Sequence, residues 1–164
     1  MAALLCSDPN YRSANYCIAR ADTRCRHCGR TTRVLALLVP EDHEALDTET
    51  AEELNTWQLA GANAFLFYVA HLPESVQRRL FQLSPAFRVA HSRATSNAYW
   101  ANHCEHCDTL LDDYELHCET DGAFMPCSEA EAGNILLLQI DEPFEAVAAG
   151  CALEPEFFRF MRKA

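Results

Sequence analysis

The chain has 164 residues, 49% of them hydrophobic and 23% charged, which is typical of one soluble globular domain with a buried core. No apolar run approaches the roughly 20 residues of a membrane-spanning helix, and residues 1–9 lack the basic start and the apolar length of a signal peptide. The net charge of -11 disfavours non-specific binding to phosphate backbones. We expect a single cytoplasmic domain over residues 1–164.

The first 33 residues differ in charge from the rest of the chain. They hold six arginines and two aspartates, a net charge of +4, whereas the remainder carries -15. The arginines are Arg12, Arg20, Arg24, Arg26, Arg30 and Arg33. We expect them to offset an anionic metal centre and to cover the surface. The alternative is a nucleic-acid interface, but the interleaved aromatic residues of such a surface are missing.

Residues 1–24 contain the turn signal Asp8-Pro9-Asn10, and we expect them to form an irregular arm. A Cys-x-x-Cys-Gly turn then runs from Cys25 to Gly29. Glycine there allows the positive φ angle that a tight ligand turn often requires. Residues 31–39 are rich in β-branched and apolar residues and stop at Pro40, which predicts a strand. The near-continuous apolar run at 34–39 indicates that both of its faces are covered.

Residues 41–53 are strongly acidic and lead into a helix signal. A capping box at 50–53 predicts a helix of about 10 residues that ends near Gly61. Residues 62–70 are aromatic and apolar, so they suit either a buried strand or a continuation of that helix. We favour the strand because Gly61 interrupts the helical pattern and Pro73 follows closely.

Five further elements follow. Pro73 begins a predicted helix that Ser84-Pro85 ends. Residues 87–91 alternate like a half-buried strand, residues 97–101 lead into a second cysteine turn, and residues 110–118 are expected to form another strand. On that strand, the neighbours Asp112 and Asp113 would point to opposite faces, and they are more typical of a solvated turn than of a shared proton.

The last part of the chain carries turn and cap signals. Asp121-Gly122 predicts a hairpin that returns through 123–125. Residues 135–140 predict a strand, Asp141 caps an expected short helix that Gly150 closes, and residues 156–162 suggest a final helical turn or two. The fold class is therefore α+β, an antiparallel sheet with short helices.

Two cysteine turns carry the clearest chemical signal. Residues 104–107 repeat the spacing of residues 25–28, and both copies read Cys-x-His-Cys. Zinc prefers four such ligands in a tetrahedron, and each turn supplies two thiolates at about 2.3 Å from the metal. Nine cysteines are an odd number, and a cytosolic chain is kept reduced, so disulfides explain the pattern less well. We predict one structural Zn2+ per chain, in a split zinc-ribbon-like site made by Cys25, Cys28, Cys104 and Cys107.

Other uses of these turns are weaker. A thioredoxin-like redox motif needs a strand-to-helix setting, and both turns are expected to open onto strands. Four cysteine ligands leave no position for an activated water, so the metal would be structural and not catalytic. His27, His103 and His106 would then lie beside the metal or on the surface. No residue is predicted to be catalytic or to bind another cofactor.

A second group of reactive residues consists of His117, Cys118, Glu119 and Cys127. A zinc deaminase would need His-x-Glu followed by Pro-Cys-x-x-Cys. Position 130 is Ala130, so the second thiol of that motif is absent. Ordinary buried thiols explain the group better, and a hydrolase-like or deaminase-like enzyme remains the alternative.

The combined pattern resembles a group of uncharacterised bacterial proteins. It consists of Cys-x-x-Cys-Gly before an apolar strand, then residues 99–107 (Tyr-Trp-Ala-Asn-His-Cys-x-x-Cys), with Asp113 and Ala123-Phe124-x-Pro126 behind them. The resemblance implies a bacterial four-cysteine, split zinc-ribbon-like domain and no activity. Those proteins often have glycine after the second turn, where this chain has Asp108. We expect a zinc-stabilised adaptor that binds another protein and contacts no membrane.

Overall fold

The computed structural model describes residues 8–47, 56–91 and 97–164. The strands are β1 (Tyr11–Ser13), β2 (Tyr16–Arg24), β3 (Thr31–Val39), β4 (Glu44–Asp47), β5 (Thr56–Leu59), β6 (Ala64–His71), β7 (Phe87–His91), β8 (Ala98–His103), β9 (Leu110–Leu111), β10 (Leu136–Ile140), β11 (Phe144–Leu153) and β12 (Arg162–Lys163). The helices are α1 (Glu74–Leu83), α2 (Asp113–His117), α3 (Glu129–Ala132) and the 3-10 turn η2 (Phe158–Phe160).

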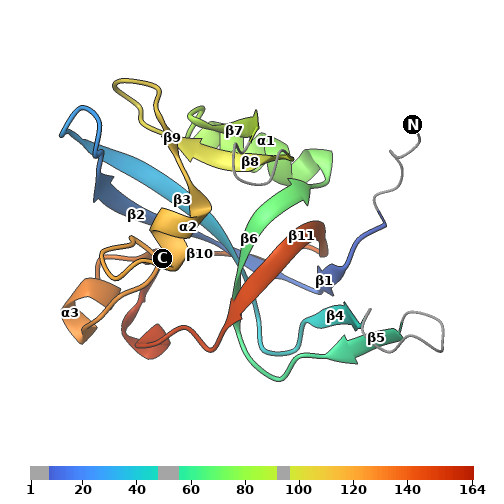
Figure 1. Cartoon of the computed structure of the whole chain (residues 1–164). Helices are drawn as coiled ribbons and strands as arrows, with labels where there is room; N and C mark the ends of the chain where they lie inside the picture. Colours follow the sequence, from blue (N-terminus) through green and yellow to red (C-terminus); the bar gives the residue numbers. More distant parts are fainter. Residues whose placement is uncertain (1–7, 48–55, 92–96) are drawn as a thin grey trace.

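The strands form one strongly bent, mixed sheet with few short helices (Figure 1). The main path runs β12-β10-β2-β3-β6-β11-β1-β4-β5, and a branch at β6 continues through β8 to β7 and β9. The pairs described are antiparallel except β10 with β12. This confirms the α+β class and corrects the expectation of an antiparallel sheet at the one parallel pair, β10 with β12. None of the helices in these residues is long and apolar enough to span a membrane.

The β2–β3 hairpin is the centre of the sheet, and it is buried on both faces. Leu35, Leu37 and Val39 point into one core, while the alternate residues Val34 and Leu38 point into another. Side chains alternate between the two faces of a strand, so the near-continuous apolar run of β3 serves both cores. The prediction that both faces are covered is confirmed.

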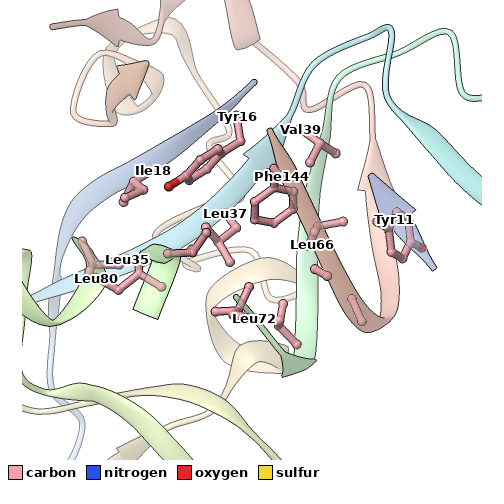
Figure 2. Packing of buried hydrophobic residues seen from close by; sticks show 14 of the residues in the cluster. Tyr11, Tyr16, Ile18, Leu35, Leu37, Val39, Leu66, Leu72, Leu80 and Phe144 are labelled. Atoms are coloured by element: carbon pink, nitrogen blue, oxygen red, sulfur yellow. The ribbon is translucent and has the colours of Figure 1, made fainter. Parts of the chain in front are cut away.

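The first core lies between β2, β3, β6, β11 and α1 (Figure 2). Tyr16 and Phe144 pack with ring centroids 4.7 Å apart, next to Leu37 and Leu66. Leu80 of α1 is fully buried there, which follows from the apolar stripe of an amphipathic helix. The second core contains Cys25 and Cys104, so it supports the cysteine turns directly.

Strand β6 bends at Tyr68, whose φ angle of +52° is unusual for a residue with a side chain. Residues 64–66 pair with β3, and Val69 pairs with Trp100 of β8 after the bend. The backbone N–H of Tyr68 donates to the carboxylate of Asp113 at 2.7 Å, because no strand neighbour accepts it. The strand predicted over 62–70 is confirmed, and the bend directs β8 and its cysteine turn toward β3.

Other predictions hold within a few residues. The helix from Pro73 to Ser84 is α1, with Pro73 at its N-cap. The strands predicted over 31–39, 87–91 and 135–140 are β3, β7 and β10. The final helical turn is the short 3-10 turn η2.

The first part of the chain differs from the predicted irregular arm. Residues 11–13 and 16–24 are strands, because Tyr16, Ile18 and Ala19 are buried between β3 and β10. The helix predicted to end near Gly61 is wrong over 56–59, where β5 pairs with β4. Its capping box at 50–53 lies outside the described residues.

Three predictions in the second half are also wrong. Residues 110–118 form a strand only at 110–111. Asp112 then caps helix α2 by accepting a hydrogen bond from the backbone N–H of Tyr114. Gly122 lies in a turn that is followed by no strand in the described part of 123–125. Residues 144–153 are strand β11 and not a helix. Gly150 is a packing glycine there, since an added Cβ would lie 2.8 Å from the Phe67 ring.

Candidate metal centre

The first cysteine turn caps the β2–β3 hairpin. The backbone N–H of Cys25 donates to Arg30 O at 2.8 Å, and Gly29 N–H donates to Cys25 O at 2.8 Å. Gly29 has a φ angle of +77°, as the sequence predicted. The turn therefore holds the Cys25 and Cys28 side chains on one side of a tight loop.

The second turn, between β8 and β9, repeats this backbone pattern. Cys104 N–H donates to Thr109 O at 2.9 Å, and Asp108 N–H donates to Cys104 O at 2.9 Å. Asp108 adopts a φ angle of +66° and so takes the left-handed conformation that Gly29 has in the first turn. Its carboxylate also forms an ion pair with Arg88 at 2.6 Å. The departure at this position therefore leaves the turn geometry intact.

The four thiols of the two turns meet in one cluster. Cys25 Sγ lies 3.6 Å from Cys107 Sγ, Cys28 Sγ lies 3.7 Å from Cys104 Sγ, and all four ligand atoms are within 4.8 Å of one another. Four sulfurs at about 2.3 Å from a tetrahedral zinc would be about 3.8 Å apart. The cluster has the dimensions of a tetrahedral thiolate site, and it could bind a metal ion.

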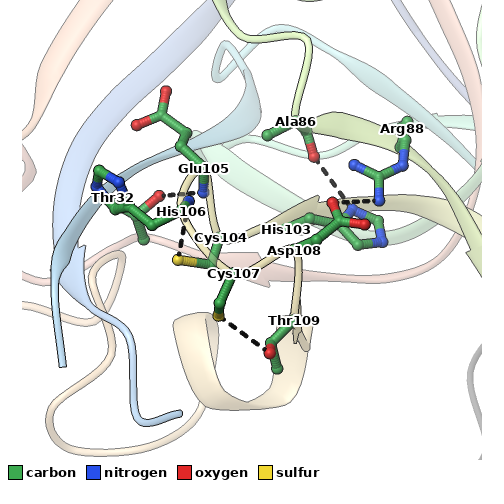
Figure 3. A network of polar contacts seen from close by, with 10 residues as sticks. All are labelled: Thr32, Ala86, Arg88, His103, Cys104, Glu105, His106, Cys107, Asp108 and Thr109. Carbon is green, nitrogen blue, oxygen red and sulfur yellow. Dashed lines mark hydrogen bonds and ion pairs between the residues drawn. The ribbon is translucent and has the colours of Figure 1, made fainter. Parts of the chain in front are cut away.

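The second turn favours thiolates, the form that binds metals. Desolvation opposes ionisation of Cys104, but the backbone N–H groups of Cys107 and His106 outweigh it and lower the pKa of Cys104 to about 6. The His106 N–H lies 3.4 Å from Cys104 Sγ (Figure 3). The Thr109 hydroxyl, 3.1 Å from Cys107 Sγ, lowers the pKa of Cys107.

In the first turn, the Cys28 thiol is hard to ionise when no cation is bound. The backbone hydrogen bond of Arg30 lowers the pKa of Cys28, but desolvation and hydrogen bonds to the other three thiols outweigh it and raise this pKa to about 11. Neighbouring thiols compete for negative charge, so only part of the cluster ionises easily on its own. A divalent cation would remove this competition by neutralising the thiolates.

Polar contacts fix the second turn against the start of β3. Glu105 N–H donates to the buried Thr32 hydroxyl at 2.9 Å, and His106 Nε2 lies 3.0 Å from Thr31 O. The Glu105 carboxylate accepts from Arg33 N–H at 3.2 Å. Two residues before Cys104, the buried Asn102 amide bonds both backbone groups of Leu35. These contacts join segments about 70 residues apart and bring the two turns together.

The three neighbouring histidines have other positions. His103 is buried with Nδ1 3.1 Å from Ala86 O, His106 contacts Thr31 as above, and His27 is exposed. In the part of the chain that the structure describes, the four cysteines are the one group of at least three potential ligands close enough for a metal.

The predicted second group does not assemble into such a site. His117 is buried among Phe65, Phe67 and Phe124, and burial lowers its pKa to about 4. Glu119 forms an ion pair with Arg26. The exposed Cys127 thiol faces the Thr120 and Met125 carbonyl oxygens, and Cys118 is exposed. Among the described contacts, no hydrogen bond joins any two of His117, Glu119 and Cys127. The expectation of buried thiols is wrong for both cysteines.

Several of the amino-terminal arginines have partners within the chain. Arg12 pairs with Glu44 and stacks over the Trp57 ring at 4.0 Å. Arg24 and Arg33 donate to backbone carbonyl oxygens, those of Gly29 and Leu83. These contacts divide the arginines among different parts of the surface.

Sequence reasoning missed three residues that shape the centre. Thr32 follows the first cysteine turn and Thr109 follows the second. A hydroxyl so close to a predicted ligand could have suggested both residues. Asp113 was interpreted as solvated, but it is buried below the bend of β6. Only the α2 N-cap signal at Asp112 could have indicated a helix there.

No protein-family model, curated protein or solved structure matches this chain. The cluster of Cys25, Cys28, Cys104 and Cys107 therefore carries the functional argument.

Proposed function

We propose that the chain is a zinc protein in which one Zn2+ is bound by Cys25, Cys28, Cys104 and Cys107 as a structural clip. The observation that carries the proposal is the convergence of four thiols from two similar turns at tetrahedral spacing. Thiolate ligands in this geometry select zinc or iron–sulfur chemistry over magnesium and calcium, and zinc is the usual occupant of a single four-cysteine site.

A structural role follows from the ligand set. Four cysteines fill the tetrahedron, so no coordination position is left for a water or a substrate. The metal would close a loop of about 80 residues, and a cross-link of this length stabilises a fold by about 4 kcal/mol in the entropic treatment. Because thiolates must stay reduced to bind zinc, we propose a cytoplasmic location. The resemblance in the two cysteine turns is the reason for proposing membership of the bacterial four-cysteine family.

Native mass spectrometry of freshly purified protein, with no metal added, tests the proposal. We expect one zinc per chain, and we expect Cys25→Ser and Cys104→Ser to lose both the metal and the cooperative unfolding transition. Cys118→Ser, which changes an exposed thiol outside the cluster, is the matched control. Protein that holds no metal, or that keeps zinc in both cluster variants, would contradict the proposal.

We further propose that the zinc-stabilised fold acts as an adaptor through protein–protein contacts. A groove of about 700 Å3 lies between α1 and the β7–β8 pair. Phe81 and Val89 line it and are 63% and 48% exposed, which is unusual for large apolar side chains. Arg78 and Arg88 also line the groove, and their exposed ion pairs are weak enough to exchange. The groove suits a segment of another protein that combines apolar and acidic residues.

Two labelled peptides with the same apolar residues, one bearing glutamates and one lysines, test this surface by fluorescence anisotropy. We expect the acidic peptide to bind more tightly, and Phe81→Ser to weaken it at least tenfold. Leu59→Ser, at an equally exposed leucine on β5, is the control. Equal binding of both peptides, or no effect of Phe81→Ser, would rule out this groove as the adaptor surface.

A further inference from the structure

A cavity of about 480 Å3 lies beside the metal centre, and its two walls come from distant parts of the chain. One wall is the end of β2 and the first cysteine turn, from Thr23 to Gly29. The other is the segment from Leu111 to Asp121, which contains α2. The volume is within the range of about 300 to 1,000 Å3 that is typical of small-molecule sites.

The two walls carry opposite charges. Arg24 and Arg26 line the side of the cysteine turn, whereas Glu115 and Asp121 line the side of α2. Arg26 also forms an ion pair with Glu119 at 2.5 Å, which links the walls at one point. The lining charges balance, so a simple anion or cation would face repulsion from one wall.

Two of the lining residues are apolar. Leu111 and Leu116 line the cavity and are 5% and 3% exposed, as parts of the second core. Arg24 uses its Nε to donate to Gly29 O, which holds the guanidinium while its terminal nitrogens keep further donors. Among the described residues, the carboxylates of Glu115 and Asp121 form no direct ion pair, and they interact with the Arg26 charge only at longer range.

We propose that this cavity binds a zwitterionic aliphatic α-amino acid. The ligand carboxylate pairs with Arg24, the ammonium group lies against Glu115 and Asp121, and the aliphatic side chain packs on Leu111 and Leu116. A guanidinium is well suited to a carboxylate because its planar fork can donate two parallel hydrogen bonds. The inference does not depend on the adaptor groove, but it requires the folded cysteine turn as one wall.

Isothermal titration of the zinc-loaded protein with three matched probes tests the proposal. Leucine carries both charges, leucinamide only the positive charge, and 4-methylpentanoate only the negative charge. We expect leucine to bind at least tenfold more tightly than either analogue. The absence of leucine binding, or equal binding of one analogue, would overturn the proposal.

Surface variants assign the two charged walls separately. Arg24→Gln should remove the preference for leucine over leucinamide, because the carboxylate loses its partner. Glu115→Gln combined with Asp121→Asn should remove the preference for leucine over 4-methylpentanoate. Arg30→Gln, at an exposed arginine of the same turn outside the cavity, is the control and should retain both preferences. Unchanged preferences in the wall variants would place any leucine site elsewhere.

Discussion

The side-chain amide of Asn102 on β8 forms two hydrogen bonds with the backbone of Leu35 on β3. Leu35 N–H donates to Asn102 Oδ1 at 2.8 Å, and Asn102 Nδ2 donates to Leu35 O at 2.9 Å. The amide thus replaces a backbone ladder between two strands that have no backbone pairing in the described sheet. It fixes the position of Cys104, two residues further on, relative to the hairpin that carries Cys25.

Asn102→Ala should lower the free energy of unfolding by about 2 to 6 kcal/mol, because it leaves two buried backbone groups of Leu35 without a partner and each costs about 1 to 3 kcal/mol. Zinc affinity should fall with it, since the two cysteine turns lose part of their alignment. Urea unfolding and competition with a chromophoric zinc chelator measure the two effects. The control is Asn134→Ala, at an exposed asparagine. Equal effects of the two substitutions would show that the bridge does not align the turns.

Asp108 and Gly29 occupy equivalent positions in the two cysteine turns, with φ angles of +66° and +77°. A left-handed conformation costs an L-residue about 1 to 2 kcal/mol, and aspartate tolerates it better than alanine. We expect Asp108→Ala to destabilise the zinc-bound protein by about 1 kcal/mol, whereas Asp108→Gly should be close to neutral. Arg88→Gln removes the exposed ion pair alone and should change stability by less than about 1 kcal/mol. Thermal unfolding measures all three, and equal destabilisation by alanine and glycine would show that the ion pair matters more than the backbone.

Gly122 packs directly against the end of α2. A Cβ atom there would lie 2.5 Å from Leu116 O and 2.6 Å from Glu115 O, and neither backbone carbonyl can rotate away. Gly122→Ala should therefore destabilise the fold by about 1 to 3 kcal/mol or more, as overpacking does elsewhere. Gly133→Ala is the control. At 3.4 Å its nearest contact is ordinary, its φ angle is -63°, and alanine should be neutral or slightly stabilising. Denaturant midpoints distinguish the two, and similar midpoints would contradict the close approach.

The sequence predicted the four-cysteine cluster and the β3 strand because both have local signals. Cys-x-x-Cys spacing places two thiols in one turn, and the meeting of the two turns needs only that a tetrahedral metal takes four ligands. Residues 34–39 (Val-Leu-Ala-Leu-Leu-Val) include no polar position, so burial on both faces was the one consistent arrangement for that part of the strand. These parts required no knowledge of distant contacts.

The errors occurred where tertiary contacts overrule local signals. Gly150 suggested the end of a helix, but in β11 it makes room for the Phe67 ring, which no local pattern encodes. The aspartate pair at 112–113 is typical of a solvated turn, but the bend at Tyr68 leaves the backbone N–H of Tyr68 without a strand partner. This N–H donates a hydrogen bond to the Asp113 carboxylate. The turn signal at residues 8–10 favours an irregular arm, but residues 16–24 are a strand because Tyr16 and Ile18 are buried where β2 pairs with β3 and β10.

Two buried groups near α2 should give stability opposite dependences on pH. Burial raises the pKa of Asp113 to about 7, with the nearby Asp112 charge adding to the effect and the Tyr68 N–H opposing it. Burial among phenylalanine rings lowers the pKa of His117 to about 4. In the unfolded chain the pKa values of Asp113 and His117 are about 4 and about 6.5. Between pH 4 and 7 the folded state therefore holds an extra proton on Asp113, and between pH 4 and 6.5 it lacks one on His117.

Stability rises with pH wherever the unfolded state binds more protons. The Asp113 contribution is fully present below about pH 4 and is lost as the pH rises through 7. The His117 contribution is present above about pH 6.5 and is lost as the pH falls through 4.

In the native chain the two slopes partly cancel. Asp113→Asn keeps an oxygen for the Tyr68 N–H and leaves the His117 slope, so its stability should rise relative to the native protein from pH 4 to 6.5. His117→Phe should do the reverse. Urea unfolding at saturating zinc, taken as differences from the native protein at each pH, removes the shared effect of metal binding. A difference that does not change with pH in either variant would show that the group removed in that variant titrates normally in the fold.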